Sequence, residues 1–327
     1  MKNVKPGKKL RRWLVWTGWV ILVQFILMNI SAALYAYKLT HLKDLPSEML
    51  THKPVSRNVF SKTWRLFTGP DFYRQPLSDT PSFPFAPLQL GTENGIAIEA
   101  WYAKPDSASK GAVILFHGMT VNKGYVLDEA SVFRDWGYSV LMVDVRSHGN
   151  SAGEVTTIGY KEAEEVKVAY DHIRSSGERK IVLWGASMGA VIIAKAIADY
   201  RLQPTAAIIE MPFLSLQSHL KGRARILGFP EQPFAFLTTF WIGAENGFNG
   251  FGFNTTRYAK NIHCPVMVQY GNKDELVQSR ETEKVYQAIP SAAKKLVIYE
   301  NARHESLLRN DPAAWKKEVS EFLEKLK

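Results

Sequence analysis

The 327-residue sequence contains a single cysteine, Cys264, so no disulfide bond can form within one chain. Such sparing use of cysteine is typical of a reducing compartment but is also compatible with an exported protein. The spacings H-x-H, H-E-x-x-H and C-x-x-C are all absent, which argues against a catalytic metal ion. No glycine-rich phosphate loop follows a predicted strand, and no nucleic-acid motif is present. The sequence therefore predicts no metal, no cofactor and no nucleic-acid partner.

Acidic residues are missing from the first twelve positions, which carry much of the chain's net charge of +10. Six basic residues lie there: Lys2, Lys5, Lys8, Lys9, Arg11 and Arg12. Without them the other 315 residues carry a net charge of +4, which does not suggest a nucleic-acid surface.

Charged residues are absent from the next 25 positions, 13–37, between Arg12 and Lys38. At ~1.5 Å per residue this stretch makes a helix of about 37 Å, enough to cross a hydrocarbon core of ~30 Å. We expect 13–37 to be an uncleaved transmembrane anchor, with the basic tail 1–12 in the cytoplasm and the rest of the chain outside. The alternative is a signal peptide cleaved near the small residues 31–33, which would release a secreted protein.

Residues 38–87 form a connecting region in which long regular elements are not expected, because prolines recur throughout it. The prolines are Pro46, Pro54, Pro70, Pro76, Pro81, Pro84 and Pro87. The region also holds more aromatic residues than a free linker would, so we expect it to pack against the following domain or the bilayer surface.

From residue 88 to 327 the chain alternates short apolar runs with helical patterns. The predicted strands are 96–103, 112–116, 139–145, 180–184, 206–209, 266–270 and 296–299, and the predicted helices are 124–136, 160–175, 190–200 and 312–327. Near-continuous apolar strands that alternate with helices predict a mostly parallel sheet covered on both faces.

A G-x-S-x-G pentapeptide, Gly185 to Gly189, lies between one of these strands and a helix. A sharp turn in this context raises the hydroxyl of Ser187 above the end of the sheet, where a base and a substrate can reach it. Gly185 and Gly189 leave room for the close approach of the strand end and the helix start. We therefore expect Ser187 to be a nucleophile.

Five motifs in order resemble the α/β-hydrolase superfamily, and within it the serine aminopeptidase and Bem46-like hydrolases. They are His117-Gly118-Met119 after a strand, the loop 144–151, the pentapeptide 185–189, the loop 271–275 and the loop 302–305. The resemblance covers residues 88–327 and implies an eight-stranded sheet with a lid insertion, here residues 211–261. One departure is Ser147, where the family often has glycine.

The resemblance implies a catalytic triad of Ser187, Asp274 and His304. A serine hydroxyl needs a positioned base, which an imidazole supplies near neutral pH, and the imidazole needs an acceptor on its other nitrogen. The backbone N–H groups of Met119 and Met188 are the expected oxyanion-hole donors.

Several other residues in or near these motifs have expected roles outside the triad. His117 and Gly118 are expected to shape the oxyanion loop, and Glu275 and Glu210 are fallback acids should Asp274 be a surface turn residue. His219 lies in the predicted lid, where it can contact substrate.

Three functions remain open at this stage. The first is a membrane-anchored serine hydrolase that cleaves a carboxylic ester through an acyl-enzyme, with a small-molecule or lipid-like substrate suggested by the aromatic lid. The second is an aminopeptidase-like serine peptidase, for which the lid offers only the acids Glu231 and Glu245, or a thioesterase. The third is a non-catalytic scaffold. A serine alone does not identify its acyl substrate.

Overall fold

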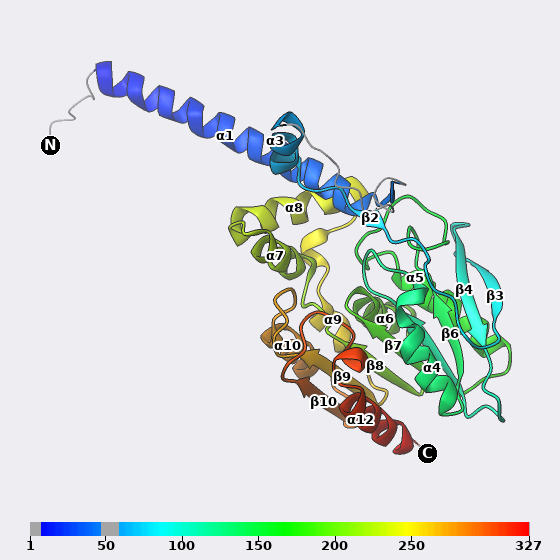
Figure 1. Ribbon diagram of the computed structural model, residues 1–327. Helices are drawn as coiled ribbons and strands as arrows, with labels where there is room; N and C mark the ends of the chain where they lie inside the picture. The colour runs from blue at the N-terminus through cyan, green and yellow to red at the C-terminus, as the bar shows by residue number, and fades with distance from the viewer. Residues whose placement is uncertain (1–7, 47–58, 327) are drawn as a thin grey trace.

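The computed structural model describes residues 8–46 and 59–326, which form one long helix followed by an α/β domain (Figure 1). The helix, α1 (Lys8–Thr40), extends away from the domain at its N-terminal end. Most of the predicted basic tail, including Lys2 and Lys5, lies outside the described residues, as does Pro54 of the connecting region.

Eight strands form the central sheet, in the order β10-β9-β8-β7-β5-β6-β4-β3. Their bounds are β3 (Ala86–Gly91), β4 (Ala97–Ala103), β5 (Ala112–Phe116), β6 (Ser139–Val143), β7 (Ile181–Ala186), β8 (Ala206–Glu210), β9 (Val266–Gly271) and β10 (Lys294–Tyr299). Strand β4 is antiparallel to both neighbours and the other pairs are parallel. The predicted mostly parallel eight-stranded sheet is confirmed, and the seven strands with predicted ranges begin and end within two residues of them.

The sheet is covered on both faces because side chains alternate along its strands. In β5, Ile114 and Phe116 join a core with helices α5 (Ala163–Ser175), α6 (Met188–Tyr200) and α10 (Ser279–Ala288). Val113 and Leu115 of the same strand join the opposite core with α4 (Leu127–Asp135), α11 (Leu307–Asn310) and α12 (Pro312–Glu324). Apolar layers on both faces therefore fix the position of the sheet. The loops at the carboxyl ends of its strands begin from this fixed framework.

Two predicted helices begin later than the sequence pattern indicates. Residues 123–126 form a 3₁₀ turn, η1 (Lys123–Val126), before α4, because the Asn122 side chain accepts from the N–H of Gly124. The predicted helix 160–175 begins at Ala163, because the carboxylate of Glu162 accepts the N–H groups of Thr157 and Gly159 and holds the preceding loop. Side-chain capping of loops therefore sets both boundaries.

The segment between β8 and β9 is helical. It contains α7 (Leu216–Leu227), α8 (Glu231–Asn246), η2 (Gly250–Gly252) and α9 (Thr255–Ala259). Gly243 and Gly250 lie where the segment packs closely on itself. A Cβ on Gly243 would lie 2.6 Å from the carbonyl oxygen of Phe248, and one on Gly250 would lie 2.5 Å from that of Thr239. These glycines permit close packing of the segment on itself.

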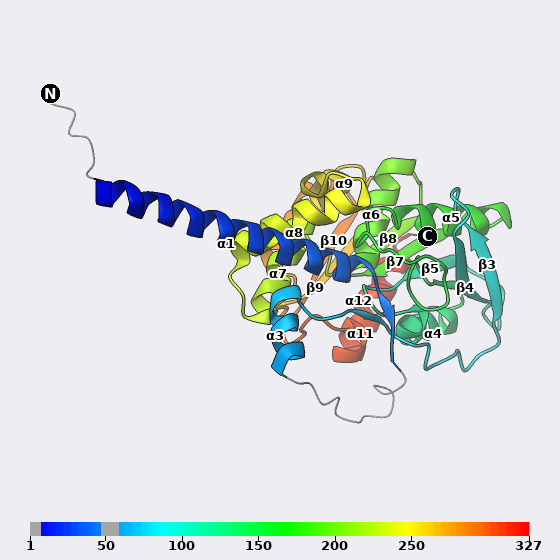
Figure 2. The ribbon, with the colours of Figure 1, turned by 90° about the horizontal axis from the view of Figure 1, so that it is seen from above.

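The C-terminal turns of α1 are part of the folded body. Tyr35, Ala36 and Leu39 are buried, and the Tyr35 ring packs edge-on against Phe234 of α8. The Trp241 indole donates to the Asn29 side chain at 3.3 Å. Figure 2 shows α8 alongside this end of α1. Helix α1 therefore continues without a break into contacts with the insertion.

The connecting region also packs against α1. Its helix α3 (Val59–Thr68) ends where the ammonium group of Lys38 donates to the Thr68 hydroxyl at 2.8 Å. Strands β1 (Lys43–Asp44) and β2 (Tyr73–Arg74) pair as a separate parallel two-stranded sheet. The described part of this region is therefore attached to the body rather than free.

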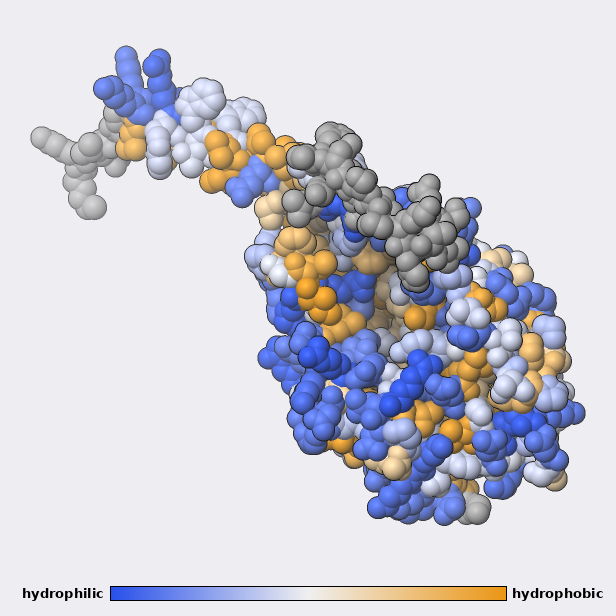
Figure 3. Space-filling view, in the orientation of Figure 1, coloured by the Kyte–Doolittle hydropathy of each residue, from blue (hydrophilic) through white to orange (hydrophobic). Residues whose placement is uncertain are grey.

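The N-terminal part of α1 exposes its apolar side chains. Large hydrophobic residues are exposed from Leu10 to Ile30, with Trp16 72% accessible. Figure 3 shows hydrophobic side chains along the projecting helix and hydrophilic ones near its free end. Twenty-one residues of helix span about 31 Å at ~1.5 Å per residue, close to the thickness of a hydrocarbon core.

Candidate active site

The turn between β7 and α6 holds Ser187 in a strained backbone conformation, with φ +55° and ψ −115°. A Cβ on Gly185 would lie 2.6 Å from the carbonyl carbon of Gly189, and one on Gly189 would lie 2.1 Å from the carbonyl oxygen of Phe116. Neither contact is tolerable, so both positions require glycine. A non-glycine residue at positive φ costs of order 1–3 kcal/mol and persists only where the surrounding structure imposes it.

Ser187, His304 and Asp274 form one hydrogen-bonded chain. His304 Nε2 lies 3.0 Å from Ser187 Oγ, and His304 Nδ1 lies 2.7 Å from Asp274 Oδ2. The other oxygen of Asp274 accepts the N–H groups of Leu276 and Val277, both at 2.8 Å. The carboxylate is thus fixed by its own loop, which in turn orients the imidazole toward the serine.

The serine opens into a cavity of about 260 Å³. Gly118, Met119 and His304 line it, together with Tyr125, Met211, His219, Arg223 and Leu276, among others. Met188 follows Ser187 at the start of α6 and is buried. All of the residues predicted for the site therefore lie in or directly beside this cavity.

His117 is fully buried beneath the loop that carries Met119. Its Nε2 accepts the N–H of Val145 at 3.2 Å, so Nδ1 carries the proton and donates to the Gly118 carbonyl at 2.7 Å. Burial lowers the pKa of His117 to about 4, which keeps the ring neutral. The residue ties the Gly118 backbone to the end of β6 and is not positioned as a base.

The loop after β6 is organised around Asp144. This buried carboxylate accepts from the ammonium group of Lys123 at 2.5 Å and from the Asn150 N–H at 2.9 Å. Lys123 also lies 2.8 Å from Glu99. Ser147, in the same loop, has φ +63° and a buried hydroxyl with no partner among the described residues. Its backbone conformation explains why glycine suits this position.

Glu210, one of the fallback acids, lies in the cavity but does not contact His304. Its Oε1 accepts from the indoles of Trp184 and Trp315 at 3.1 and 2.7 Å, and from Gln269 at 3.0 Å. Burial, and then the nearby charge of Glu129, raise the pKa of Glu210 to about 8. A carboxyl held neutral by burial is unsuited to stabilise an imidazolium.

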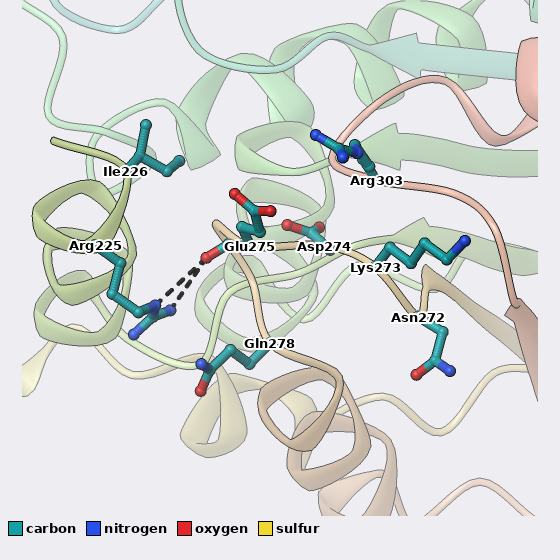
Figure 4. Close-up of a pocket in the computed structure, with 8 residues that line it drawn as sticks. All are labelled: Arg225, Ile226, Asn272, Lys273, Asp274, Glu275, Gln278 and Arg303. Atoms are coloured by element: carbon teal, nitrogen blue, oxygen red, sulfur yellow. Dashed lines mark hydrogen bonds between the residues drawn. The ribbon is translucent and has the colours of Figure 1, made fainter. Parts of the chain in front are cut away.

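The second fallback acid, Glu275, lies on the outer side of the Asp274 loop. Figure 4 shows Arg225 of α7 donating to the backbone carbonyl oxygen of Glu275. The Nε and Nη2 atoms of Arg225 both lie 3.4 Å from this oxygen. Arg225 also pairs with Glu231 at 2.8 Å. The insertion and the acid loop are therefore linked here, outside the catalytic cavity.

Sequence reasoning missed Arg223 and Glu129 as cavity residues. Arg223 follows His219 by four positions on α7, a spacing that puts two side chains on one helix face. That spacing was a usable signal, since His219 was already expected to reach the substrate.

A cleft at the carboxyl ends of a parallel sheet, with a serine on a strand-to-helix turn bonded to a histidine and an aspartate, defines the α/β-hydrolase class. Residues 107–241 and 247–312 match the family model described as serine aminopeptidase, S33. The chain belongs to this family, and it is a hydrolase of the α/β-hydrolase superfamily.

Individual relatives are distant. The chain is 26% identical over 235 residues to the uncharacterized membrane protein YNL320W of Saccharomyces cerevisiae, covering 71% of this chain and 78% of the relative. It is 23% identical over 229 residues to the protein bem46 of Schizosaccharomyces pombe, covering 68% and 72%. The structure of the Pyrococcus furiosus esterase Pf2001 aligns with a TM-score of 0.64 and 24% identity, covering 77% of this chain and 98% of that one. The expected resemblance to Bem46-like hydrolases is confirmed.

Proposed function

We propose that the protein is a membrane-anchored serine esterase that works through an acyl-enzyme. The observation that carries this proposal is the hydrogen-bonded chain from Ser187 Oγ through His304 to Asp274, at the wall of a cavity. The esterase Pf2001, which shares the fold, supports the choice of ester chemistry.

In the first half of the reaction Ser187 Oγ attacks the ester carbonyl carbon while His304 Nε2 takes the hydroxyl proton. Asp274 stabilises the imidazolium that forms. The N–H groups of Met119 and Met188 donate to the oxyanion of the tetrahedral intermediate. Collapse of this intermediate breaks the bond to the leaving alcohol, which receives the proton from His304 and leaves an acyl-serine.

In the second half water attacks the acyl-serine. His304 takes a proton from the water and returns it to Ser187 Oγ as the acyl–oxygen bond breaks, so a carboxylic acid is released and the enzyme is restored. No cofactor enters either half, because serine and imidazole supply both the nucleophile and the proton transfer.

The membrane anchor in this proposal is the exposed part of α1. Because Ala32, Tyr35 and Ala36 are buried against the body, we assign the lipid-contacting stretch to about residues 13–30 rather than the whole of 13–37. The basic residues at the N-terminal side put residues 1–12 in the cytoplasm and the hydrolase domain outside. Cleavage near residue 31 would remove the Asn29 side chain that Trp241 contacts, which favours the uncleaved form.

A lipid-like substrate is the finer part of the proposal. The insertion between β8 and β9 overhangs the cavity with His219 and Arg223 of α7 and contacts the anchor through α8. Its aromatic residues differ in exposure: Phe213 and Phe253 are buried, Phe229, Phe236 and Phe240 are exposed, and Phe234, Trp241 and Phe248 are partly buried. An insertion that contacts both the anchor and the cavity is suited to a lid over substrates drawn from a membrane.

The aminopeptidase alternative has weaker support. A site for a peptide's amino group requires an ionised acid in the cavity, but Glu231 is paired with Arg225 outside it. Burial raises the pKa of Glu245 to about 7, and Glu245 does not line the cavity.

A fluorophosphonate probe tests the nucleophile, since it forms a covalent bond to an activated serine. We expect labelling of the full-length protein and none of Ser187→Ala. Ser306→Ala is the matched control, because Ser306 lines the same cavity. Labelling that survives Ser187→Ala would overturn the assignment.

A substrate panel separates the reaction types. We expect hydrolysis of p-nitrophenyl esters of several chain lengths and little release from aminoacyl p-nitroanilides. Faster release from the anilides would favour the peptidase, and faster cleavage of acyl thioesters would favour a thioesterase. Unreactivity toward the whole panel and the probe would favour a scaffold.

Protease added to intact spheroplasts tests the topology. Degradation of the hydrolase domain is expected. Protection until the membrane is opened would reverse the orientation, and a soluble product that begins near Leu34 would mean that the anchor is cleaved.

A further inference from the structure

His219 is a buried imidazole with no protein partner on either ring nitrogen. It is only 2% exposed, lines the catalytic cavity and rests against the Phe213 ring at a centroid distance of 4.9 Å. Among the described residues, neither Nδ1 nor Nε2 has a hydrogen-bond partner. Leaving a buried polar group unpaired costs about 1–3 kcal/mol, so a ligand that bonds to this ring recovers that cost.

Arg223 lines the same cavity one helical turn further along α7. Its guanidinium carbon lies 4.8 Å from the Phe72 ring centroid. No carboxylate in residues 8–46 or 59–326 forms an ion pair with it. An aromatic face contacts the plane of the guanidinium and leaves the N–H donors at its edge available, which is the geometry that binds carboxylate and phosphate.

None of the three glutamates in the cavity wall forms an ion pair with Arg223 in the described part of the chain. Glu210 is neutral for the reasons given above, and burial also raises the pKa of Glu129, whose carboxyl accepts from the Ser306 hydroxyl at 2.6 Å. Glu305 is turned toward the Arg303 N–H and the Asn310 amide. Arg223 therefore lies in the cavity wall without an ion-pair partner among the described residues.

The position of His219 and Arg223 relative to His304 indicates which part of an ester substrate these two side chains would contact. Arg223 and His219 lie one helical turn apart on α7 and line the same cavity as His304. In the proposed mechanism His304 delivers its proton to the leaving alcohol, and the oxyanion loop of Met119 holds the acyl carbonyl. The alcohol therefore leaves on the side of His219 and Arg223.

We propose that Arg223 and His219 form a subsite for an anionic group, phosphate or carboxylate, on the alcohol portion of the ester. Arg223 supplies charge and paired N–H donors, and His219 supplies one N–H. This inference rests on the proposed esterase function. It extends that function by naming the substrate class: esters of an acidic alcohol such as a glycerol phosphate.

The test compares two esters that differ only in the anionic group. Full-length protein in detergent micelles is given 1-oleoylglycerol 3-phosphate or 1-oleoylglycerol, and oleate release is measured. We expect the wild type to prefer the phosphate ester. Arg223→Gln should lower kcat/KM for it by about ten- to a hundredfold, the range of one charge-assisted hydrogen bond, and change the neutral ester less than about threefold.

Matched variants separate direct contact from other effects. Lys221→Gln removes a positive charge from the same helix outside the cavity and should leave the preference unchanged. Arg223→Lys keeps the charge but loses the planar fork, so an intermediate preference is expected. His219→Asn, which keeps a donor, should retain more of the preference than His219→Phe.

A second ester pair identifies the side of the scissile bond. p-Nitrophenyl hemiglutarate carries its carboxylate on the acyl portion, and p-nitrophenyl butyrate is neutral. Arg223→Gln should not alter their ratio. A change confined to this pair, or an equal loss with both oleoyl esters, would overturn the inference. Fluorophosphonate labelling of each variant at the wild-type rate verifies an intact Ser187. Failure of the wild type to label would instead overturn the proposed function.

Discussion

The catalytic cavity and the apolar cavity between α1 and the insertion differ in chemistry. The apolar cavity, of about 370 Å³, is lined by Leu27, Met28, Tyr35, Phe234 and Leu237, among others, with no charged side chain. The catalytic cavity holds Ser187, three glutamates, two histidines and an arginine in its wall. The catalytic cavity has the groups for proton transfer and charge recognition. The apolar cavity lies where α1 packs against the insertion. Substitutions in the two should therefore affect different measurements.

The largest effect is expected from the base of the catalytic cavity. His304→Ala should lower kcat by about 10⁴-fold or more toward a p-nitrophenyl ester, and Asp274→Asn by somewhat less, because triad members act as a unit. Initial rates at saturating ester provide the measurement. Glu210→Gln is the matched control. If it inactivates the enzyme while Asp274→Asn does not, Asp274 is not the acid.

The next largest effect is expected in the apolar cavity. Tyr35→Ala removes a buried ring that packs against Phe72 and Phe234, which should cost about 3–5 kcal/mol of stability. Thermal unfolding in detergent provides the measurement, and kcat below the transition should be unchanged.

Tyr35→Phe is the control for that substitution. The Tyr35 hydroxyl is buried without a partner among the described residues, so its removal should be neutral or stabilising. A large loss of kcat in either variant at low temperature would show that the two cavities are coupled.

A smaller effect depends on pH and concerns Glu210. An unfolded glutamate ionises near pH 4.5, whereas folded Glu210 keeps its proton up to about pH 8. Between these values the folded state binds more protons, so this residue's contribution to stability is full below about pH 4.5 and is lost as pH rises toward 8. Glu210→Gln cannot ionise. Relative to Glu210→Gln, the free energy of unfolding of the wild type should fall by about 3–5 kcal/mol between about pH 4.5 and pH 8.

Unfolding midpoints of both proteins at pH 5, 6.5 and 8 provide the check. The three histidines with lowered pKa values, His117, His148 and His219, change stability in the opposite direction below pH 6.5 but are common to both proteins. Parallel pH profiles would mean that Glu210 is ionised in the folded state.

The smallest effect is expected at Ser147. Ser147→Gly should relieve its positive φ and remove an unpartnered hydroxyl, for a net gain of about 0.5–1 kcal/mol after the larger entropy of unfolded glycine. Ser147→Ala removes the hydroxyl but keeps the Cβ. If alanine stabilises as much as glycine, the backbone is not strained there.

Local patterns in the sequence were sufficient for much of the site. The pentapeptide around Ser187 can be recognised because the steric demand on Gly185 and Gly189 arises within five residues. Apolar runs located the strands, and the resemblance of the loops after β9 and β10 to the α/β-hydrolase motifs then implied Asp274 and His304. Each of these inferences depends on residues close together in the chain.

Long-range contacts account for what was not predicted. The ion pairs of Lys123 with Asp144 and Glu99, for example, join residues that are distant in sequence. The raised pKa of Glu210 depends on its burial and on the charge of Glu129, which is distant in sequence. The role of Arg223 depends on which face α7 turns toward Ser187. Propensity and periodicity carry no information about such orientations.

The continuity of α1 has a mechanical consequence. Thirty-three residues of helix, about 50 Å at ~1.5 Å per residue, run from the exposed apolar stretch into the packed contacts of Tyr35 and Leu39. With the proposed anchor, no flexible linker separates the bilayer from the enzyme. The tilt of α1 therefore sets the height of the catalytic cavity above the membrane and the direction in which it opens. Such a protein would diffuse in the plane of the membrane with its active site at a fixed orientation to the bilayer. A flexible linker inserted at the end of α1 would abolish that fixed orientation.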